Sequence, residues 1–251
     1  MILVGLSGAI GSGKTTFAEF LAAMQEKHVH WESWELIAEI GNALLVEQLN
    51  KDFSGDYTEL NKWLEPLPDL VLQVTHQPLP KTKGLVTTQA VTANPDQFAK
   101  LFEFTQTLAR DHSLQQGAIT LDSKEQYRSL LQWLGGYLAK NVSGDIWYGE
   151  ITRRIATTRA IELATVGGVR FPADAAALRA AGGHILTIER PNIVVRDANE
   201  ITERESKLIE PDAIISNDGS LHELIGVAQT VYSDLKNNAL KSRYSSQRNK
   251  L

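Results

Sequence analysis

Residues 8–15 read GAIGSGKT, and this stretch decides the fold that the chain is expected to adopt. It matches the spacing G-x-x-x-x-G-K-[ST] in full, which is typical of a phosphate-binding P-loop. A short run of strand-forming residues, 2–6, precedes it. Apolar residues recur after it at the spacing of an amphipathic helix, namely Phe17, Phe20, Leu21 and Met24. The motif therefore lies between an expected strand and an expected helix, as a P-loop requires.

The residue types of this loop suit the triphosphate of a nucleotide. Glycines allow the backbone to wrap so that successive N–H groups face phosphate oxygens, and the following helix N-terminus adds positive partial charge. We expect Lys14 to neutralise the β- and γ-phosphates and the Thr15 hydroxyl to ligate Mg²⁺. Thr16 is either an α-phosphate contact or an ordinary residue of the first helical turn. The predicted ATP-binding residues of the loop are Gly8, Gly11, Ser12, Gly13, Lys14, Thr15 and Thr16.

The composition excludes several classes of protein. The 251 residues include 25 Lys and Arg against 30 Asp and Glu, and a formal net charge of −5 argues against broad binding to nucleic acid or anionic membranes. The absence of cysteine excludes disulfides, thiolate metal sites and cysteine nucleophiles. No apolar run approaches the ~18 residues that span a bilayer, and the first residues lack the basic flank of a signal peptide. We therefore expect a cytoplasmic protein with small-molecule nucleotides as partners, no stable nucleic-acid partner and no membrane.

A P-loop also occurs in GTPases and ATP-driven motors, but their diagnostic motifs are missing. A GTPase would carry N-K-x-D, and none of the Asn-Lys pairs fits it. A motor would carry an apolar strand ending in Asp-Glu; the closest stretch, 118–122, is followed by Ser123, which forms a capping box with Gln126 for the next helix. What remains is a small P-loop kinase, an α/β fold whose parallel sheet is flanked by helices, with an inserted region that gathers the phosphate acceptor.

The remaining pattern predicts a core interrupted by that insertion. Residues 29–31 suggest a second strand, and Ser33 caps a helix that continues to about residue 49. Residues 70–75 and 85–91 flank a Pro/Lys/Gly segment and predict a β-hairpin, and a helix follows from Asn94 to about residue 116. We predict a kinase core at 1–33 and 115–232, an inserted acceptor-binding region with a helical hairpin at 34–114, and a flexible tail at 233–251. The tail is weakly basic, and an arm that binds nucleic acid is its alternative interpretation.

The helix expected after Ser123 carries two faces. One is an apolar stripe, and the other combines Arg128, Gln132, Gly135 and Gly136 at helical spacing. Two glycines inside a helix cost about 1 kcal/mol each relative to alanine. The second face is therefore either a ligand-binding face or a close helix contact with solvated polar side chains. Trp147, in the first turn of the next expected helix, either stacks on a base or belongs to the core.

Three segments of the C-terminal third complete a resemblance. They are Val-Arg-Phe-Pro at 169–172, after an expected strand at 163–169, the Gly-Gly strand at 182–190, and Asn-Asp-Gly-Ser at 217–220. Together with the P-loop and the spacing R-x-x-x-Q-x-x-G from Arg128, they resemble the deoxynucleoside monophosphate kinases of tailed bacteriophages. The resemblance covers about residues 1–40 and 123–232. If a phage encodes the protein, its compartment is the host cytoplasm. The sequence is also compatible with a homodimer.

The resemblance implies phosphoryl transfer from ATP to a deoxynucleoside monophosphate with Mg²⁺ as the cofactor. It also implies that the Arg128 helix, Trp147 and Arg170 lie near the acceptor, where planar guanidinium groups suit phosphate. Glu32 orients the acceptor, accepts its proton or only complements a helix N-terminus. The predicted catalytic residues are Lys14, Arg128 and Arg170, and the predicted acceptor-binding residues are Glu32, Arg128, Gln132, Trp147 and Arg170.

Asn217 and three arginines are further candidates outside the P-loop. Asn217 precedes a capping box of Ser220 and Glu223, and it either passes over the adenine of ATP or only starts a helix. The segment after the Gly-Gly strand contains arginines that either close a lid over the phosphates or carry solvated surface charge. They are Arg190, Arg196 and Arg204.

Two departures from the resembled family bear on the site. Its members usually have Asp where this chain has Gly168 and Glu where it has Asp174, so a carboxylate that could organise Mg²⁺ or the acceptor is missing from its expected place. Glu32 and Asp174 are the candidate replacements. The family's Gly-Thr pair is Gly135-Gly136 here, which removes a hydroxyl from the expected acceptor site. Two other functions therefore stay open: a P-loop kinase for a deoxynucleoside or dephospho-coenzyme A, and a non-catalytic ATP-binding module.

Overall fold

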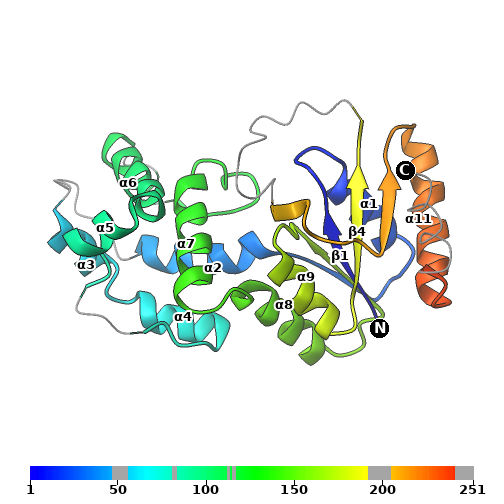
Figure 1. The fold of residues 1–251 in the computed structure, drawn as a ribbon, viewed down its shortest axis with the longest axis horizontal. Coiled ribbons are helices and arrows are strands. Elements are labelled where there is room, and N and C mark those ends of the chain that lie inside the picture. Colours follow the sequence, from blue (N-terminus) through cyan, green and yellow to red (C-terminus); the bar gives the residue numbers. More distant parts are fainter. Residues whose placement is uncertain (47–55, 81–83, 112–113, 115–116, 192–204, 241–251) are drawn as a thin grey trace. The chain divides into compact units, whose positions relative to one another are not determined.

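The computed structural model describes residues 1–46, 56–80, 84–111, 114, 117–191 and 205–240. The chain divides into two compact units, and Figure 1 labels most of their helices and some of the strands. The first, the sheet unit, consists of Met1–Ser33 and Tyr148–Leu251. The second, the helical unit, is Trp34–Trp147. In the chain, the helical unit is therefore a single insertion between two parts of the sheet unit.

The sheet unit contains five parallel strands in the order β2-β3-β1-β4-β5. β1 lies in the centre and is buried along nearly its whole length, which explains its unbroken run of apolar residues. This arrangement confirms the predicted α/β fold with a parallel sheet flanked by helices. The strands are β1 (Ile2–Ser7), β2 (His28–Glu32), β3 (Leu163–Gly167), β4 (His184–Glu189) and β5 (Ala213–Ser216).

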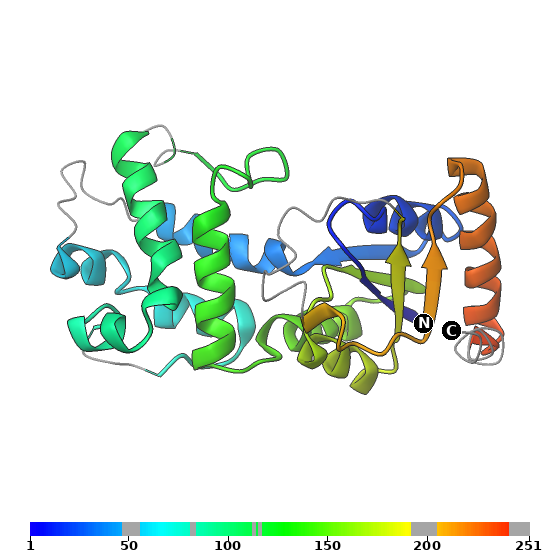
Figure 2. The same cartoon turned by 45° about the horizontal axis from the view of Figure 1, so that its top comes forward.

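Helices cover both faces of this sheet. On one face, α1 (Lys14–Ala22) and α11 (Leu221–Lys236) share a hydrophobic core with Val4 and Leu6 of β1. Gly5 points to the other face, where a Cβ atom would lie 2.6 Å from the Leu178 side chain of α9 (Pro172–Ala180). Figures 1 and 2 show α9 and α11 on opposite sides of the strands. α8 (Ile146–Thr157) leads from the helical unit back into the sheet unit.

The helical unit has a core of aromatic side chains, and its described residues contain no strand. Trp133 and Tyr137 lie on one helix, with ring centroids 5.2 Å apart, and Tyr137 meets Phe98 of another helix edge to face. No helix in the described part of either unit is long and apolar enough to span a membrane. The helices are α2 (Ser33–Val46), α3 (Tyr57–Trp63), α4 (Leu67–Thr75), α5 (Thr88–Ala93), α6 (Pro95–Arg110) and α7 (Arg128–Asn141).

The helical unit extends to Trp147, whereas the expected insertion ended at residue 114. The segment before α7 is tied to α2 by Asn42, whose side chain accepts a hydrogen bond from the Ile119 N–H at 2.6 Å and donates one to its carbonyl at 3.2 Å. Gly41 permits this close approach, because a Cβ atom there would lie 2.7 Å from Ile119 Cδ1. These contacts join residues from both sides of the expected boundary in one compact unit.

The predicted β-hairpin is wrong, because residues 70–75 lie in helix α4 and residues 88–91 lie in helix α5. Leu67, Val71 and Thr75 of α4 are buried at intervals of four residues, which is helical spacing. Thr87 caps α5 through its hydroxyl, which accepts from the Ala90 N–H at 3.1 Å. At residues 70–75, the apolar pattern that suggested a strand was therefore the buried side of a short helix, whereas α5 buries no side chain.

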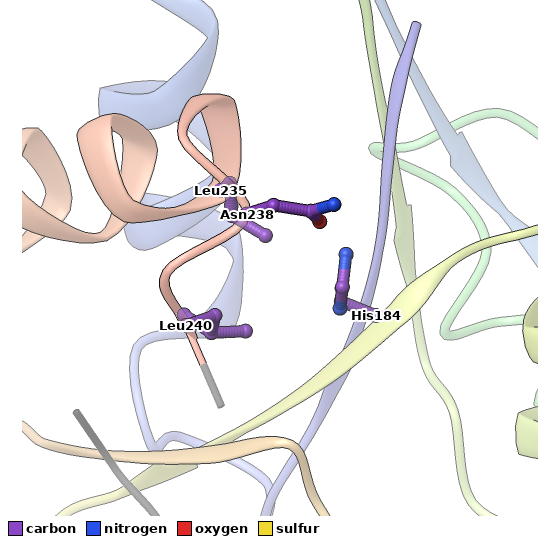
Figure 3. Close-up of a pocket in the computed structure, with 4 residues that line it drawn as sticks. All are labelled: His184, Leu235, Asn238 and Leu240. Atoms are coloured by element: carbon purple, nitrogen blue, oxygen red, sulfur yellow. The ribbon is translucent and has the colours of Figure 1, made fainter. Parts of the chain in front are cut away.

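Other expected helix boundaries also differ, and the helix that was expected to continue to about residue 116 ends at Arg110. Ser123 does not begin a helix, since its hydroxyl donates to the Ala118 carbonyl within a turn and α7 starts only at Arg128. At the other end, α11 continues to Lys236, past the residue where a flexible tail was expected. Leu235 and Leu240 are buried and, with Asn238 and His184 of β4, line a pocket (Figure 3). The rest of the expected tail, 241–251, lies outside the described residues.

Candidate active site

The P-loop connects β1 to α1 through three glycines with left-handed backbone. Gly8, Gly11 and Gly13 have φ values of +130°, +81° and +98°, which side-chain-bearing residues rarely adopt. A Cβ atom at Gly8 would also lie 2.3 Å from the Ile188 carbonyl oxygen of β4. The sequence spacing of the glycines is thus dictated by the wrap of the loop.

Side chains of the P-loop turn back onto the loop itself. Lys14, the first residue of α1, donates from Nζ to the Gly8 carbonyl at 2.8 Å and to the Ala9 carbonyl at 2.7 Å. Ser12 is fully buried, and its Oγ has no hydrogen-bond partner among the described residues. Thr15 is exposed and Thr16 is half-buried in the first turn of α1. The loop therefore holds a cation and an unsatisfied polar group at a helix N-terminus, which is an environment suited to phosphate.

Asn217 connects the turn after β5 to this loop. Its Nδ2 donates to the Ser12 carbonyl at 2.8 Å, and its backbone N–H donates to the Glu189 carbonyl of β4 at 2.7 Å. The predicted capping box is confirmed: Ser220 accepts from the Glu223 N–H, and the Glu223 carboxylate accepts from the Ser220 N–H. Asn217 therefore contacts the P-loop backbone directly.

The Glu32 carboxylate lies over the end of strand β3. Strands β2 and β3 pair Glu32 with Gly167, and a Cβ atom at Gly167 would lie only 2.0 Å from Glu32 Oε1. Alternation along β3 puts Gly167 on the same face as Leu163, which belongs to the core shared with α1. His30, two residues earlier on that face, hydrogen-bonds Thr165 at 2.8 Å, and its Nε2 lies 3.5 Å from Glu32 Oε1. Glu32 is therefore on the α1 side of the sheet, at the edge where the P-loop begins.

Asp174 has a different environment, at the start of α9. Its Oδ2 accepts from the backbone N–H groups of Arg170 at 3.0 Å and Phe171 at 2.9 Å. Burial raises the pKa of this carboxyl to about 6, although those two hydrogen bonds and the Arg170 charge oppose the shift. Tyr148 lies close by and donates to the Gly167 carbonyl at 3.1 Å; burial and the Asp174 charge raise its pKa. Asp174 thus fixes the turn that carries the half-buried Arg170.

The other candidate acceptor residues belong to the helical unit. Arg128 is exposed at the start of α7 and pairs with Glu125, and Gln132 is exposed one turn later. Gly136 has open space around its α-carbon, whereas a Cβ atom at Gly135 would lie 3.1 Å from Ile37 Cδ1. The two glycines therefore differ: Gly135 serves helix packing and Gly136 faces solvent.

Trp147 is buried in the structure, with 6% of its surface exposed. Its indole N–H donates to the Gly135 carbonyl at 3.1 Å. Of the expected lid arginines, Arg190 is exposed directly after β4, and Arg196 and Arg204 lie outside the described residues.

Comparison with protein families matches residues 2–227 to the model described as deoxynucleotide monophosphate kinase. The chain belongs to this family. No curated protein matches the sequence. This match confirms the deoxynucleotide monophosphate kinase family that the sequence resembles, and as a member the chain is a nucleotide kinase.

In this deoxynucleotide monophosphate kinase, the sheet unit brings together two groups of residues predicted from sequence. One group is the P-loop with Asn217, and the other is Glu32 and Gly168 with Arg170 and Asp174. Parallel strands put both groups at the carboxyl ends of the sheet, where α/β proteins bind ligands. Arg128, Gln132 and Trp147 form a third group in the helical unit. Sequence reasoning missed Tyr148, His30 and Gly167; the only signal was the Gly167-Gly168 pair at a strand end.

Proposed function

We propose that this kinase transfers the γ-phosphoryl group of ATP to the phosphate of a deoxynucleoside monophosphate, using Mg²⁺. The bond between the γ-phosphorus and the β,γ-bridging oxygen breaks, an acceptor phosphate oxygen bonds to that phosphorus, and ADP leaves with a deoxynucleoside diphosphate. The observation that carries the proposal is the complete P-loop, with Lys14 lying across a loop of left-handed glycines and Ser12 buried beneath it. Family membership supplies the class of acceptor.

Lys14 is proposed to stabilise charge that moves during the transfer. Its ammonium lies 2.8 Å and 2.7 Å from two loop carbonyls, so it is already held over the concave side of the loop. A loose transition state spreads negative charge over the phosphoryl oxygens, and a fixed cation stabilises that charge without rearrangement. Exchange of carbonyl partners for phosphate oxygens strengthens the interaction, because both partners are then charged.

The residues present suit Mg²⁺ held mainly by phosphate and water. Among the described residues, no three His, Asp or Glu side chains gather as a metal site. Mg²⁺ usually keeps several waters and takes one or two protein ligands together with substrate phosphates. Thr15, at the start of α1, and Glu32 would supply these contacts. Bound Mg²⁺ would neutralise charge on the phosphate oxygens.

Glu32 is a better candidate than Asp174 for the missing carboxylate. Asp174 is 5% exposed, and its Oδ2 already accepts hydrogen bonds from two backbone N–H groups. Its pKa of about 6 leaves the carboxyl partly protonated near neutral pH. The Glu32 side chain is 25% exposed and lies on the α1 side of the sheet. A phosphate acceptor is largely ionised at pH 7, since its second pKa is about 6, and it needs no general base. Glu32 is therefore proposed to orient Mg²⁺ and its waters, not to accept a proton.

Arg170 of the sheet unit is proposed to contact the acceptor. In the helical unit, Arg128 and Gln132 of α7 are proposed to contact it as well. Asp174 fixes the backbone of Arg170, which limits the conformational freedom that this arginine must lose on binding. Trp147 is proposed to support this face from below through its bond to the Gly135 carbonyl, because it is too buried to stack on a base. We propose that Arg190 lies near the phosphates as a lid residue.

A panel of acceptors with ATP and Mg²⁺, scored by ADP release, tests the function. Deoxynucleoside monophosphates should stimulate turnover, and deoxynucleosides and dephospho-coenzyme A should not. Turnover with a deoxynucleoside or with dephospho-coenzyme A would identify that compound as the acceptor and contradict the proposal. ATP binding without stimulation by any acceptor would identify a non-catalytic module.

A further inference from the structure

We propose that Asn217 is a positioning residue that holds the Ser12–Gly13 peptide so that the Gly13 N–H faces the bound triphosphate. The inference rests on the proposed binding of a triphosphate by the P-loop. It gives Asn217 a role different from the predicted contact with adenine, because the side chain acts on the protein backbone and not on the base.

The anchor of Asn217 is the sheet itself. β4 and β5 pair Glu189 with Ser216, and the next residue, Asn217, donates its backbone N–H to the Glu189 carbonyl at 2.7 Å. The side chain therefore starts from a fixed point at the end of the strand. From there, Nδ2 reaches the Ser12 carbonyl at 2.8 Å, across 205 residues of sequence. This contact ties the phosphate loop to β5.

The geometry of a peptide bond converts this contact into an effect on the opposite side of the loop. In a planar trans peptide, the carbonyl of one residue and the N–H of the next point in opposite directions. With the Ser12 carbonyl held toward Asn217, the Gly13 N–H must point away from Asn217. Backbone N–H groups turned to the concave side of such a loop bind phosphate oxygens.

Gly13 shows how closely the Asn217 amide is packed. A Cβ atom at Gly13 would lie 2.4 Å from Asn217 Nδ2, and the φ of +98° at Gly13 already disfavours other residues. The amide thus lies directly against the α-carbon of the residue whose N–H it orients. Asp218, the next residue in the same turn, is exposed and has no such contact in the described structure, so it provides a matched control.

The test uses calorimetry to measure the affinity of the full chain for two probes, each in the presence of Mg²⁺. The probes are ATP and inorganic tripolyphosphate. Asn217→Ala should weaken the binding of both probes by a similar factor of about tenfold, because the hydrogen bond to the Ser12 carbonyl acts on the phosphate contacts. Asn217→Asp should weaken both further, since a carboxylate oxygen would face the Ser12 carbonyl. Asp218→Asn should bind both probes like the wild type. Neither measurement needs an acceptor, so the result does not depend on the proposed phosphoryl transfer.

Several outcomes would overturn the assignment. A loss for ATP with unchanged tripolyphosphate binding would show that Asn217 contacts the base. Unchanged binding of both probes in folded Asn217→Ala would show that the hydrogen bond does not position the loop. If that variant does not fold, Asn217→Asp, which keeps the size of the side chain, decides by the same comparison. A wild-type protein that binds neither probe would also overturn it, because no phosphate would then be positioned.

Discussion

Replacing Gly167 with alanine tests whether the position of the Glu32 carboxylate serves the reaction. A Cβ atom at residue 167 would lie 2.0 Å from Glu32 Oε1 and 2.4 Å from its Cδ, whereas ordinary contacts begin at 3.4 Å. The carboxylate must therefore shift by about 1.4 Å or turn away. Gly167 is not among the glycines with positive φ, so alanine brings no backbone strain of its own. The substitution thus acts on Glu32 from a neighbouring strand.

The expected effect is a higher demand for Mg²⁺. A hydrogen bond to a charged group contributes about 1.5–3 kcal/mol, and each 1.4 kcal/mol corresponds to a factor of ten. The Mg²⁺ concentration for half-maximal rate should therefore rise about 10- to 100-fold in Gly167→Ala, measured at saturating ATP and acceptor. Glu32→Gln should give a similar rise. Because both changes remove the same contact, the double variant should add little to either.

A second variant and a control sharpen this test. Gly168 has a φ of +68°, which Asp tolerates better than most residues, and a Cβ atom there would lie 3.1 Å from Glu32 Oε2. Gly168→Asp should therefore lower the raised Mg²⁺ demand of Glu32→Gln. The control is Gly226→Ala, in open space on α11. This variant should leave the Mg²⁺ concentration for half-maximal rate unchanged and stabilise the fold by up to about 1 kcal/mol. An unchanged Mg²⁺ midpoint in folded Gly167→Ala would refute the reasoning.

Three further predictions concern the charged residues. Lys14→Ala should lower turnover about 10²- to 10³-fold or more while shifting the melting temperature by only a few degrees, as seen by comparing kinetics with thermal unfolding; retained turnover would exclude its phosphate role. Arg128→Ala and Arg170→Ala should raise KM for the monophosphate with nearly intact ATP affinity, and the lysine variants should recover only part of the loss, because the planar fork is missing; a fall in ATP affinity alone would contradict this. The pKa of Asp174 is about 6 in the folded protein, against an ordinary value of 3.8. Between these two pH values the folded protein binds a proton that the unfolded chain has lost. The free energy of unfolding should therefore fall as pH rises through this window, by at most about 3 kcal/mol. Asp174→Asn should remove this slope in denaturant titrations from pH 4 to pH 7.5, and an unchanged slope would mean that another group titrates.

The nucleotide-binding half of the site was predictable because its chemistry is local. A P-loop binds phosphate with the backbone of consecutive residues, so the constraints on Gly8, Gly11, Gly13 and Lys14 appear as spacing within one short stretch. Strands β1 and β3 were predictable for a related reason: the centre of a parallel sheet is buried on both faces, which produces continuous apolar runs. The capping box before α11 was another local signal that the structure bears out.

The insertion was harder to predict from sequence. The short helix α4 is held by the packing of a few buried side chains, whereas α5 has no buried side chain and begins at the Thr87 cap. Over six to nine positions, their apolar residues fit a strand pattern as well as a helical one. The attachment of residues 117–147 to this unit depends on Asn42 and Gly41, which are distant in sequence from Ile119. No local pattern carries that information.

By itself, the sequence determined the P-loop, the parallel α/β core and the family, since each depends on residues close together in the chain or on a periodic pattern. Only the tertiary structure decided that the Glu32 carboxylate lies over Gly167 at the end of β3, and that the Asn217 side chain reaches the P-loop. Glu32 and Gly167 are separated by 135 positions, and Asn217 and Ser12 by 205. Their contacts exist because parallel strands bring distant segments to one edge of a sheet, where a missing Cβ atom leaves room for a neighbour's side chain.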